Sequence, residues 1–249
     1  LCKVLDDNWS VLEQSKDGHL VPAMRLLANH LENPRSFVTF AGETSSGKST
    51  LINSFLGRRL LPAGARPTTG TVTWLEYGVA KELRLLAVNR DATVEQLSME
   101  QFVALSERPD KGLLRLKAEM PETRSGFRGL NVFDTPGFNA IISEHAEVLK
   151  EFLPESDVVV FPVSYKVGFG ASDRQLMELV CDVRKQFGAL PALLVVNRTP
   201  DGVTESDKRV AEIRLNAEDI LHDKVRLIIV NSAMPTPEGD SVLPETEEL

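Results

Sequence analysis

The sequence predicts an α/β fold in which helices flank a doubly wound, mainly parallel sheet. Short apolar runs typical of strands alternate with amphipathic segments of helical periodicity along most of the chain, as they do in proteins with such sheets. Several expected strands also end in polar motifs, and ligands of doubly wound sheets bind at the carboxyl ends of the strands. We therefore expect the fold to be organised around one ligand.

The first of these polar motifs is a glycine-rich turn at residues 42–49, after an expected strand at 36–41 and before a helix that begins near Thr50. It fits G-x-x-x-x-G-K-[ST] at every fixed position, and such a loop binds polyphosphate through inward-pointing backbone N–H groups and the helix N-terminus. Lys48 is expected to reach the β- and γ-phosphates, and the Ser49 hydroxyl to bind Mg²⁺. A structural turn that binds nothing is the alternative, which the matching flanks disfavour. The predicted phosphate-loop contacts are Gly42, Glu43, Thr44, Ser45, Ser46, Gly47, Lys48, Ser49 and Thr50.

The composition limits the function classes and the setting. A formal net charge of −8 over 249 residues argues against a nucleic-acid-binding surface, because such a surface needs clustered Lys and Arg. Two cysteines are too few for a disulfide framework, so we expect a cytoplasmic location. No apolar run approaches the roughly 20 residues that span a bilayer, and we expect a soluble chain. Because it begins with Leu1, we expect it to be part of a longer protein.

Three regions are expected along the chain. Residues 1–34 form two amphipathic helices that either pack on the core or bind a partner helix, and an apolar stripe alone does not separate these alternatives. Residues 35–234 form the α/β domain. Residues 235–249 are an acidic, Pro-containing tail without a core pattern, or the start of a further stalk.

The elements of the α/β domain are predicted from periodicity and turn residues. After a Gly- and Pro-rich loop at 58–70, a strand at 71–77 and its hairpin partner at 82–88 are separated by a turn at Gly78. Capping boxes predict helices that begin after Ser98 and after Ser172. The remaining expected elements are strand 112–118, strand 130–133, helix 144–153, strand 157–163, strand 192–196, helix 205–221 and strand 225–230.

A second motif, Asp-Thr-Pro-Gly at residues 134–137, follows the strand at 130–133. At a strand end downstream of a phosphate loop, Asp134 can hold Mg²⁺ through a water molecule and the Gly137 N–H can meet a γ-phosphate. A plain turn is the alternative. Between the two motifs, a hydroxyl of Thr68 or Thr69 could close on Mg²⁺ when the γ-phosphate is present, as a switch segment does.

Together these motifs resemble those of the dynamin-like large GTPases, in particular the bacterial members. The resemblance covers about residues 36–234 and implies a P-loop GTPase domain with an enlarged sheet. It also implies pairing of two GTPase domains when GTP is bound, a helical stalk that meets membranes, and a helical neck formed by residues 1–34. The residues that carry the resemblance are 42–53, Leu61-Pro62, Arg66-Pro67-Thr68-Thr69 and 134–137.

The resemblance implies roles for individual residues. Thr69, or less favourably Thr68, is the switch threonine and completes a metal site with Ser49 and Asp134. Ser45 occupies the position that helps dynamins hold a monovalent cation, K⁺ or Na⁺. Thr44 stands where dynamin has a glutamine that orients the attacking water, so the water-positioning group stays open. The catalytic residues predicted in this way are Thr44, Ser45, Lys48 and Thr69.

The base-reading motif departs from the usual order of Asn or Thr, Lys, any residue, Asp. Pro200 takes the fourth place and Asp201 comes one residue late. In one interpretation Asp201 accepts the guanine N–H groups, Arg198 stacks on the base and Asn197 braces the phosphate loop. In the other, residues 199–202 are an ordinary turn. The loop that backs the base is predicted to contain Asn231, Ser232 and Ala233.

The sequence thus predicts Mg²⁺-dependent GTP hydrolysis by a dynamin-like GTPase domain, with GTP or GDP and Mg²⁺ as its ligands. The expected partner is a second copy of the domain. Membrane remodelling would involve lipid only through regions outside this chain, at the inner face of the cell membrane. Two alternatives stay open: a nucleotide-gated scaffold with negligible hydrolysis, which Thr44 permits, and an ATP-using P-loop enzyme, which the base motif permits.

Overall fold

The computed structural model describes residues 35–62, 71–121, 127–137, 149, 153–187 and 190–231. The predicted neck, the switch threonines, most of the predicted helix 144–153 and the tail lie outside these residues. In chain order the described elements are β1 (Ser36–Phe40), α4 (Lys48–Leu56), β2 (Thr73–Tyr77), β3 (Arg84–Asn89), β4 (Val94–Gln96), α5 (Met99–Glu107), β5 (Leu113–Met120), β6 (Leu130–Asp134), η1 (Leu153–Glu155), β7 (Val158–Ser164), α7 (Ala171–Phe187), β8 (Ala192–Asn197), α8 (Lys208–Leu221) and β9 (Arg226–Val230).

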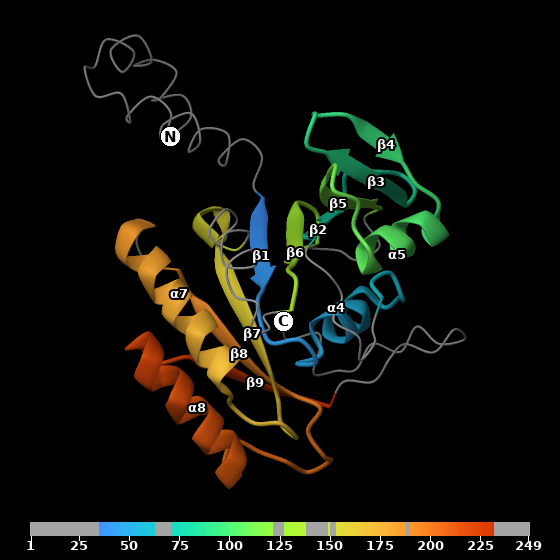
Figure 1. The fold of residues 1–249 in the computed structure, drawn as a ribbon. Helices are drawn as coiled ribbons and strands as arrows, with labels where there is room; N and C mark the ends of the chain where they lie inside the picture. The colour runs from blue at the N-terminus through green and yellow to red at the C-terminus, as the bar shows by residue number, and fades with distance from the viewer. Residues whose placement is uncertain are drawn as a thin grey trace, which may run out of the picture.

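The described strands form one nine-stranded sheet in the order β4-β3-β5-β2-β6-β1-β7-β8-β9 (Figure 1). Strands β6, β1, β7, β8 and β9 are parallel to one another. The remaining strands, β2, β5, β3 and β4, extend the sheet beyond β6. In this extension β2 is antiparallel to β6, and β3 is antiparallel to both β5 and β4. The prediction of a mainly parallel α/β sheet with flanking helices is confirmed.

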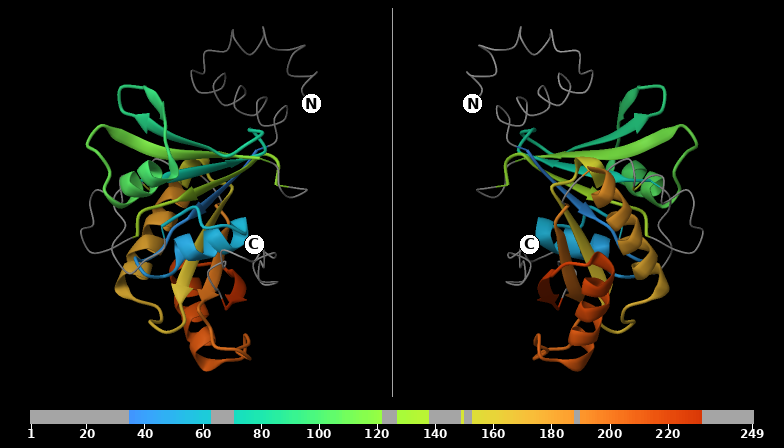
Figure 2. Two further views of the ribbon diagram at one scale, coloured as in Figure 1. Left: turned by 90° about the vertical axis from the view of Figure 1, so that its right-hand side faces the viewer. Right: turned by 90° about the vertical axis from the view of Figure 1, so that its left-hand side faces the viewer.

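Helices cover both faces of the sheet, with α7 and α8 on one face and α4 and α5 on the other (Figures 1 and 2). The alternation along β7 shows how one strand serves both faces. Val159, Phe161 and Val163 pack in the core with α7 and α8, whereas Val160 packs in the core with α4 and α5. A strand buried on both faces reads as a continuous apolar run, as predicted for this segment.

The predicted hairpin between residues 71–77 and 82–88 is wrong. Strand β5 lies between β2 and β3, parallel to β2 and antiparallel to β3. Leu75, Leu85 and Ala118 occupy neighbouring positions across the three strands and share one core. The six residues between β2 and β3 exceed a tight two-residue hairpin turn, and burial on both sides of β5 then determines the strand order.

One capping box is confirmed and the other is wrong. At α5 the Ser98 hydroxyl accepts from the Gln101 N–H at 3.2 Å, and the Gln101 side chain accepts from the Ser98 N–H at 2.8 Å. Helix α7, however, begins at Ala171, one residue before the predicted cap Ser172. The Asp173 carboxylate accepts a hydrogen bond from the Gly170 N–H at 2.9 Å. Asp173 therefore satisfies a backbone N–H just before the first residue of α7.

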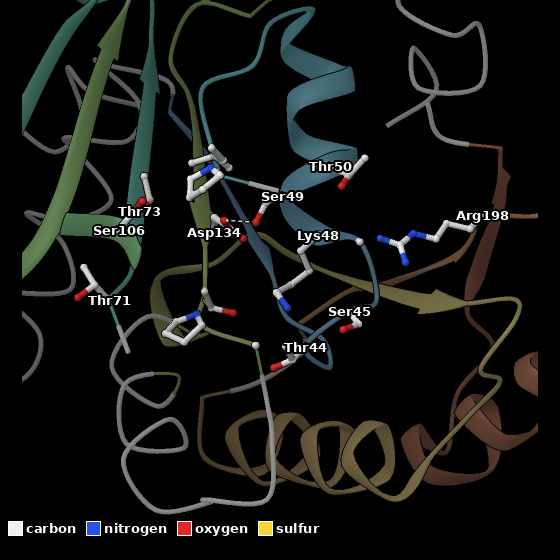
Figure 3. Close-up of a pocket in the computed structure, with 16 residues that line it drawn as sticks. Thr44, Ser45, Lys48, Ser49, Thr50, Thr71, Thr73, Ser106, Asp134 and Arg198 are labelled. Carbon is white, nitrogen blue, oxygen red and sulfur yellow. Dashed lines mark hydrogen bonds between the residues drawn. The ribbon is translucent and has the colours of Figure 1, made fainter. Parts of the chain in front are cut away.

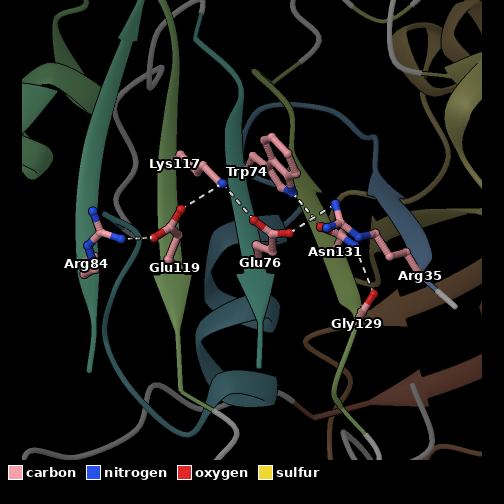
Figure 4. Close-up of polar contacts among 8 residues, drawn as sticks. All are labelled: Arg35, Trp74, Glu76, Arg84, Lys117, Glu119, Gly129 and Asn131. Carbon is pink, nitrogen blue, oxygen red and sulfur yellow. Dashed lines mark hydrogen bonds and ion pairs between the residues drawn. The ribbon is translucent and has the colours of Figure 1, made fainter. Parts of the chain in front are cut away.

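A row of charged side chains crosses β3, β5 and β2 on the face of the sheet away from α5 (Figure 4). Trp74 and Glu76 point to this face because they alternate with core residue Leu75 along β2. Lys117 Nζ lies 2.7 Å from Glu76 and 2.9 Å from Glu119, and it also lies 4.5 Å from the centre of the Trp74 ring. These contacts compensate the burial of Glu76, which a lone carboxylate would not tolerate.

Asn53 fixes the start of the loop that follows α4. Its fully buried side chain accepts from the N–H groups of Leu60 and Leu61, both at 2.9 Å, and donates to the Leu61 carbonyl at 2.7 Å. These bonds satisfy backbone groups that would otherwise be buried without partners. The C-terminal half of α4 and the segment at Leu60 and Leu61 are therefore held together by one amide.

We expect Asn53→Ala to lower the free energy of unfolding by about 2–4 kcal/mol, because it leaves buried backbone groups without partners. Urea denaturation of the two proteins measures the difference. Asn216→Ala is a matched control, since the half-buried Asn216 amide makes a solvent-exposed hydrogen bond to the Glu212 carbonyl within α8. It should stay within about 0.5 kcal/mol of wild type. An equally small effect of Asn53→Ala would contradict the proposed anchoring.

Candidate functional site

The glycine-rich loop connects the end of β1 to the start of α4, at the carboxyl edge of the parallel strands. Gly47 has a φ of +93°, a conformation that L side chains rarely adopt. A Cβ at this position would also overlap the Asn197 amide and lie 3.3 Å from Arg198 Nε. Only glycine fits here, because the loop lies directly against the end of β8.

Lys48 lies inside the loop and points into the pocket (Figure 3). Its ammonium donates to the carbonyls of Gly42 at 2.8 Å and Glu43 at 3.1 Å, and the side chain is 6% exposed. Burial lowers the pKa of Lys48, which the negative charges of Asp134 and Asp173 counteract. The site thus holds one desolvated ammonium group whose partners are the loop carbonyls and nearby carboxylates.

Ser49 and Asp134 meet across the pocket. The Ser49 hydroxyl donates to Asp134 Oδ2 at 2.9 Å, whereas Oδ1 is buried and has no partner within the part of the chain described. Burial raises the pKa of Asp134 to about 6, although Lys48 and the Ser49 hydrogen bond act in the opposite direction. A carboxylate with an unused oxygen beside a hydroxyl provides the oxygen donors that Mg²⁺ prefers. The residues present therefore fit a hydrated magnesium ion.

The Asp-Thr-Pro-Gly segment packs directly on the phosphate loop. The Thr135 hydroxyl donates to the Phe40 carbonyl at 2.7 Å, which fixes the segment against the end of β1. Gly137 lies against Thr44, since a Cβ on Gly137 would come within 2.7 Å of the Thr44 Cα. The two motifs recognised in the sequence therefore lie in contact and line one pocket.

Most of the predicted phosphate and metal residues line this pocket, namely Thr44, Ser45, Gly47, Lys48, Ser49, Thr50, Asp134 and Gly137. Arg198, which was predicted to stack on the base, lines the same pocket. Gly42 and Glu43 contribute through the carbonyls that bind Lys48. Ser46 is turned inward, and its buried hydroxyl has no partner in the described structure. Thr68, Thr69, Ser232 and Ala233 lie outside the described residues.

Sequence reasoning missed a further wall of the pocket, formed by Leu61, Pro62, Thr71, Thr73 and Ser106. Thr73 pairs directly with Asp134 across β2 and β6, a relationship that required the correct strand order. Ser106 belongs to α5, and its hydroxyl donates to Val103 within that helix. Nothing in its local sequence distinguishes it, because only the packing of α5 brings it to the site.

A second, shallow pocket adjoins the first at Arg198, and its other lining residues are Lys166, Thr199, Pro200, Asp201 and Asn231. Asn197, fully buried, donates to the Ser46 carbonyl at 3.1 Å, the contact expected of a residue that braces the phosphate loop. Arg198 adopts a φ of +60° and points toward the phosphate pocket (Figure 3). Asp201 accepts a hydrogen bond from the Asn231 amide.

Asp173 lies behind the phosphate loop at the start of α7 and is 3% exposed. Its pKa is raised to about 6, chiefly by burial and also by the negative charge of Glu43. The hydrogen bond from Gly170 and the positive charge of Lys48 lower it. This residue was predicted only as part of a helix cap, so its place near the site is new information from the structure.

None of the helices in the described part of the chain has the length and apolar character needed to span a bilayer.

The fold and the site define a P-loop nucleotide-binding domain of the GTPase class. Its defining parts are the glycine loop between a parallel strand and a helix, the facing strand-end aspartate and the asparagine at the end of β8. Residues 38–199 match the dynamin family. The chain belongs to this family, as its motifs predicted, and is a dynamin-family GTPase domain.

The relatives of this chain agree with that assignment. It is 31% identical over 142 residues to the probable transmembrane GTPase FZO-like, chloroplastic, of Arabidopsis thaliana. This match covers 57% of this chain and 12% of the relative. It is also 27% identical over 155 residues to dynamin-like protein 2 of Campylobacter jejuni, and that match covers 61% of this chain and 24% of the relative. The chain therefore spans well under half of each of these relatives.

A similar fold occurs in the solved structure of an oligomerised bacterial dynamin pair, described as a mechanism for long-range sensing and tethering of membranes. The two share a TM-score of 0.62 at 18% sequence identity, over 88% of this chain and 34% of the other. At this identity the likeness concerns the fold.

We expect Asp173→Asn to stabilise the protein in a pH-dependent way. A carboxyl whose pKa is raised on folding, from 3.8 to about 6 here, contributes stability that is present below the lower value and lost as the pH rises through the higher one. The amide keeps an acceptor for the Gly170 N–H. The variant should therefore match wild type near pH 4 and exceed it by about 2–3 kcal/mol at pH 7.

Urea denaturation at several pH values between 4 and 7 measures this difference. Asp182→Asn serves as the control on the same helix, because the Asp182 side chain is exposed and pairs with Lys185. It should change the unfolding free energy by less than about 0.5 kcal/mol at each pH. A difference for Asp173→Asn that is constant with pH would show that burial of its charge is not the cause.

Proposed function

We propose that this GTPase domain hydrolyses GTP by in-line attack of water on the γ-phosphate, with Mg²⁺ bound at Ser49 and Asp134. The observation that carries the proposal is the unpartnered Asp134 oxygen beside the Ser49 hydroxyl, in a pocket that also contains Lys48. No covalent intermediate with the protein is needed, because positioning and charge neutralisation account for catalysis in this reaction class.

Each part of the pocket has a proposed role. The loop N–H groups and Lys48 bind the β- and γ-phosphates, and the Gly137 N–H meets the γ-phosphate. Mg²⁺, when bound, neutralises the charge that develops on the phosphate oxygens. Thr69 would complete the metal site with Ser49 and Asp134. Ser45 would help to hold a monovalent cation, K⁺ or Na⁺.

Thr44 is the position that bears on whether hydrolysis is efficient. Its side chain lies against Gly137, at the end of the pocket where the γ-phosphate would bind. A hydroxyl there can hydrogen-bond a water molecule, but it lacks the reach of an amide side chain. A nucleotide-gated scaffold with negligible hydrolysis is therefore the second candidate function.

We further propose that GTP promotes a dimer of this domain in which the nucleotide lies between the copies, which would exclude water from the reaction. Support comes from the family and from the structural similarity to an oligomerised bacterial dynamin pair that tethers membranes. In this proposal membrane remodelling takes place at the inner face of the cell membrane, and lipid contact occurs through regions outside this chain.

We expect Lys48→Ala to weaken binding of a non-hydrolysable GTP analogue at least about a hundredfold, or about 3 kcal/mol, because it removes the ammonium group that faces the phosphates. Fluorescence titration with labelled nucleotide measures the affinity. Lys185→Ala is the matched control, since this exposed lysine pairs only with Asp182 among the described residues. It should bind nucleotide as wild type does.

Two further measurements on the wild-type chain separate the candidate functions. Single-turnover hydrolysis of GTP above the rate in buffer supports the enzyme, and tight binding without turnover supports the scaffold. A preference for ATP in the same titrations would favour an ATP-using enzyme. Unchanged affinity in Lys48→Ala would remove the phosphate loop from nucleotide binding.

We expect Asp201→Asn to weaken GTP binding by about 1–3 kcal/mol, because the guanine N–H groups lose a charged acceptor. It should also improve binding of xanthosine triphosphate, whose carbonyl can accept from the new amide. Competition titrations with both nucleotides measure the two effects. Asp223→Asn, at an exposed site after α8, is the control. Equal affinities in wild type and Asp201→Asn would assign Asp201 to the turn.

A further inference from the structure

Thr73 occupies a position opposite the proposed metal site. Strand β2 pairs antiparallel with β6, and the register places Thr73 directly across from Asp134. Side chains at directly opposite positions point to the same face, with Cβ atoms about 4.5–5.5 Å apart. Both residues line the phosphate pocket, and Figure 3 shows Thr73 on the side of the pocket that faces Asp134.

Thr73 is a buried polar residue on a face of β2 that is otherwise part of the core. It is 4% exposed, and Leu75 and Tyr77, the next residues on the same face, belong to the hydrophobic core. An apolar residue at position 73 would continue this pattern to the start of the strand. The hydroxyl instead lies where the core gives way to the polar pocket.

The chemistry of a hydrated magnesium ion connects the two residues. A water molecule bound to Mg²⁺ uses its lone pair on the metal, so both of its protons are available for hydrogen bonds. Asp134 Oδ1, which is buried and has no partner in the described structure, can accept a hydrogen bond from one O–H of this water. A hydroxyl oxygen on the neighbouring strand can accept a hydrogen bond from the other.

We propose that Thr73 is a positioning residue for the metal, and that its hydroxyl accepts a hydrogen bond from the water molecule that links Asp134 to Mg²⁺. The inference rests on the proposed function and deepens it. It assigns a role in the GTPase site to β2, which lies outside the parallel part of the sheet. Partners of metal ligands of this kind typically change metal affinity by about 10–100-fold when they are removed.

The test is a Mg²⁺ titration of labelled GDP binding, which reports metal affinity without requiring turnover. Thr73→Val removes the hydroxyl and keeps the shape of the side chain. It should raise the Mg²⁺ concentration needed for half-maximal effect about tenfold and leave GDP affinity in EDTA unchanged. Thr73→Ser keeps the hydroxyl and should stay within about twofold of wild type, which a purely packing role would not produce.

Thr39→Val is the control for loss of a buried threonine hydroxyl, because Thr39 lies on β1, is fully buried and is bonded to Ser156. It should leave the Mg²⁺ dependence unchanged. If valine disturbs the strand, as circular dichroism would show, Thr73→Ala supplies the same comparison. Wild-type Mg²⁺ dependence in a folded Thr73→Val or Thr73→Ala protein would overturn the inference while leaving the proposed function intact. Absence of Mg²⁺-dependent GDP binding in wild type would overturn both.

Discussion

The site depends on two opposite charges placed in a poorly solvated pocket, the Lys48 ammonium and the Asp134 carboxylate. Burial disfavours both charged forms and their mutual attraction favours them, so the pKa of Asp134 rises only to about 6 and that of Lys48 is lowered. Lys48 donates hydrogen bonds to carbonyls of the loop. Phosphate and metal would give each charge a stronger partner, as expected of a binding site.

The architecture of the sheet places these charges together. Lys48 begins α4 directly after the loop that follows β1, whereas Asp134 ends β6, and the parallel pairing of the two strands brings both to the same edge. The antiparallel extension adds Thr73 from β2 and Ser106 from α5. The extension is thus part of the pocket wall, and its position depends on the core shared by β2, β5 and β3.

Local signals in the sequence predicted the parts of the fold that local physics determines. The strand, glycine loop and helix around Gly47, and the cap at Ser98, each depend on residues close in the chain. The order of β2, β5 and β3 depends instead on burial between strands far apart in sequence, which periodicity does not encode. The site followed the same division, since Lys48, Ser49 and Asp134 were recognisable as motifs, whereas Thr73 and Ser106 acquire meaning only through strand pairing and helix packing.

The two ends of the site differ in how strongly the fold constrains them. At the phosphate end, Asn197 and Lys48 are buried and held by loop carbonyls, and the groups they position would contact features that every nucleoside triphosphate shares. At the other end, Asp201 and Asn231 are exposed and are joined by a single side-chain hydrogen bond. Affinity should therefore arise mainly from the buried end, where desolvated charges interact strongly. In the proposed base-reading role of Asp201, selectivity for the base would arise at this exposed end, where the departure from the usual motif order also lies. Base preference would then be the property of this site that a few substitutions could most readily change.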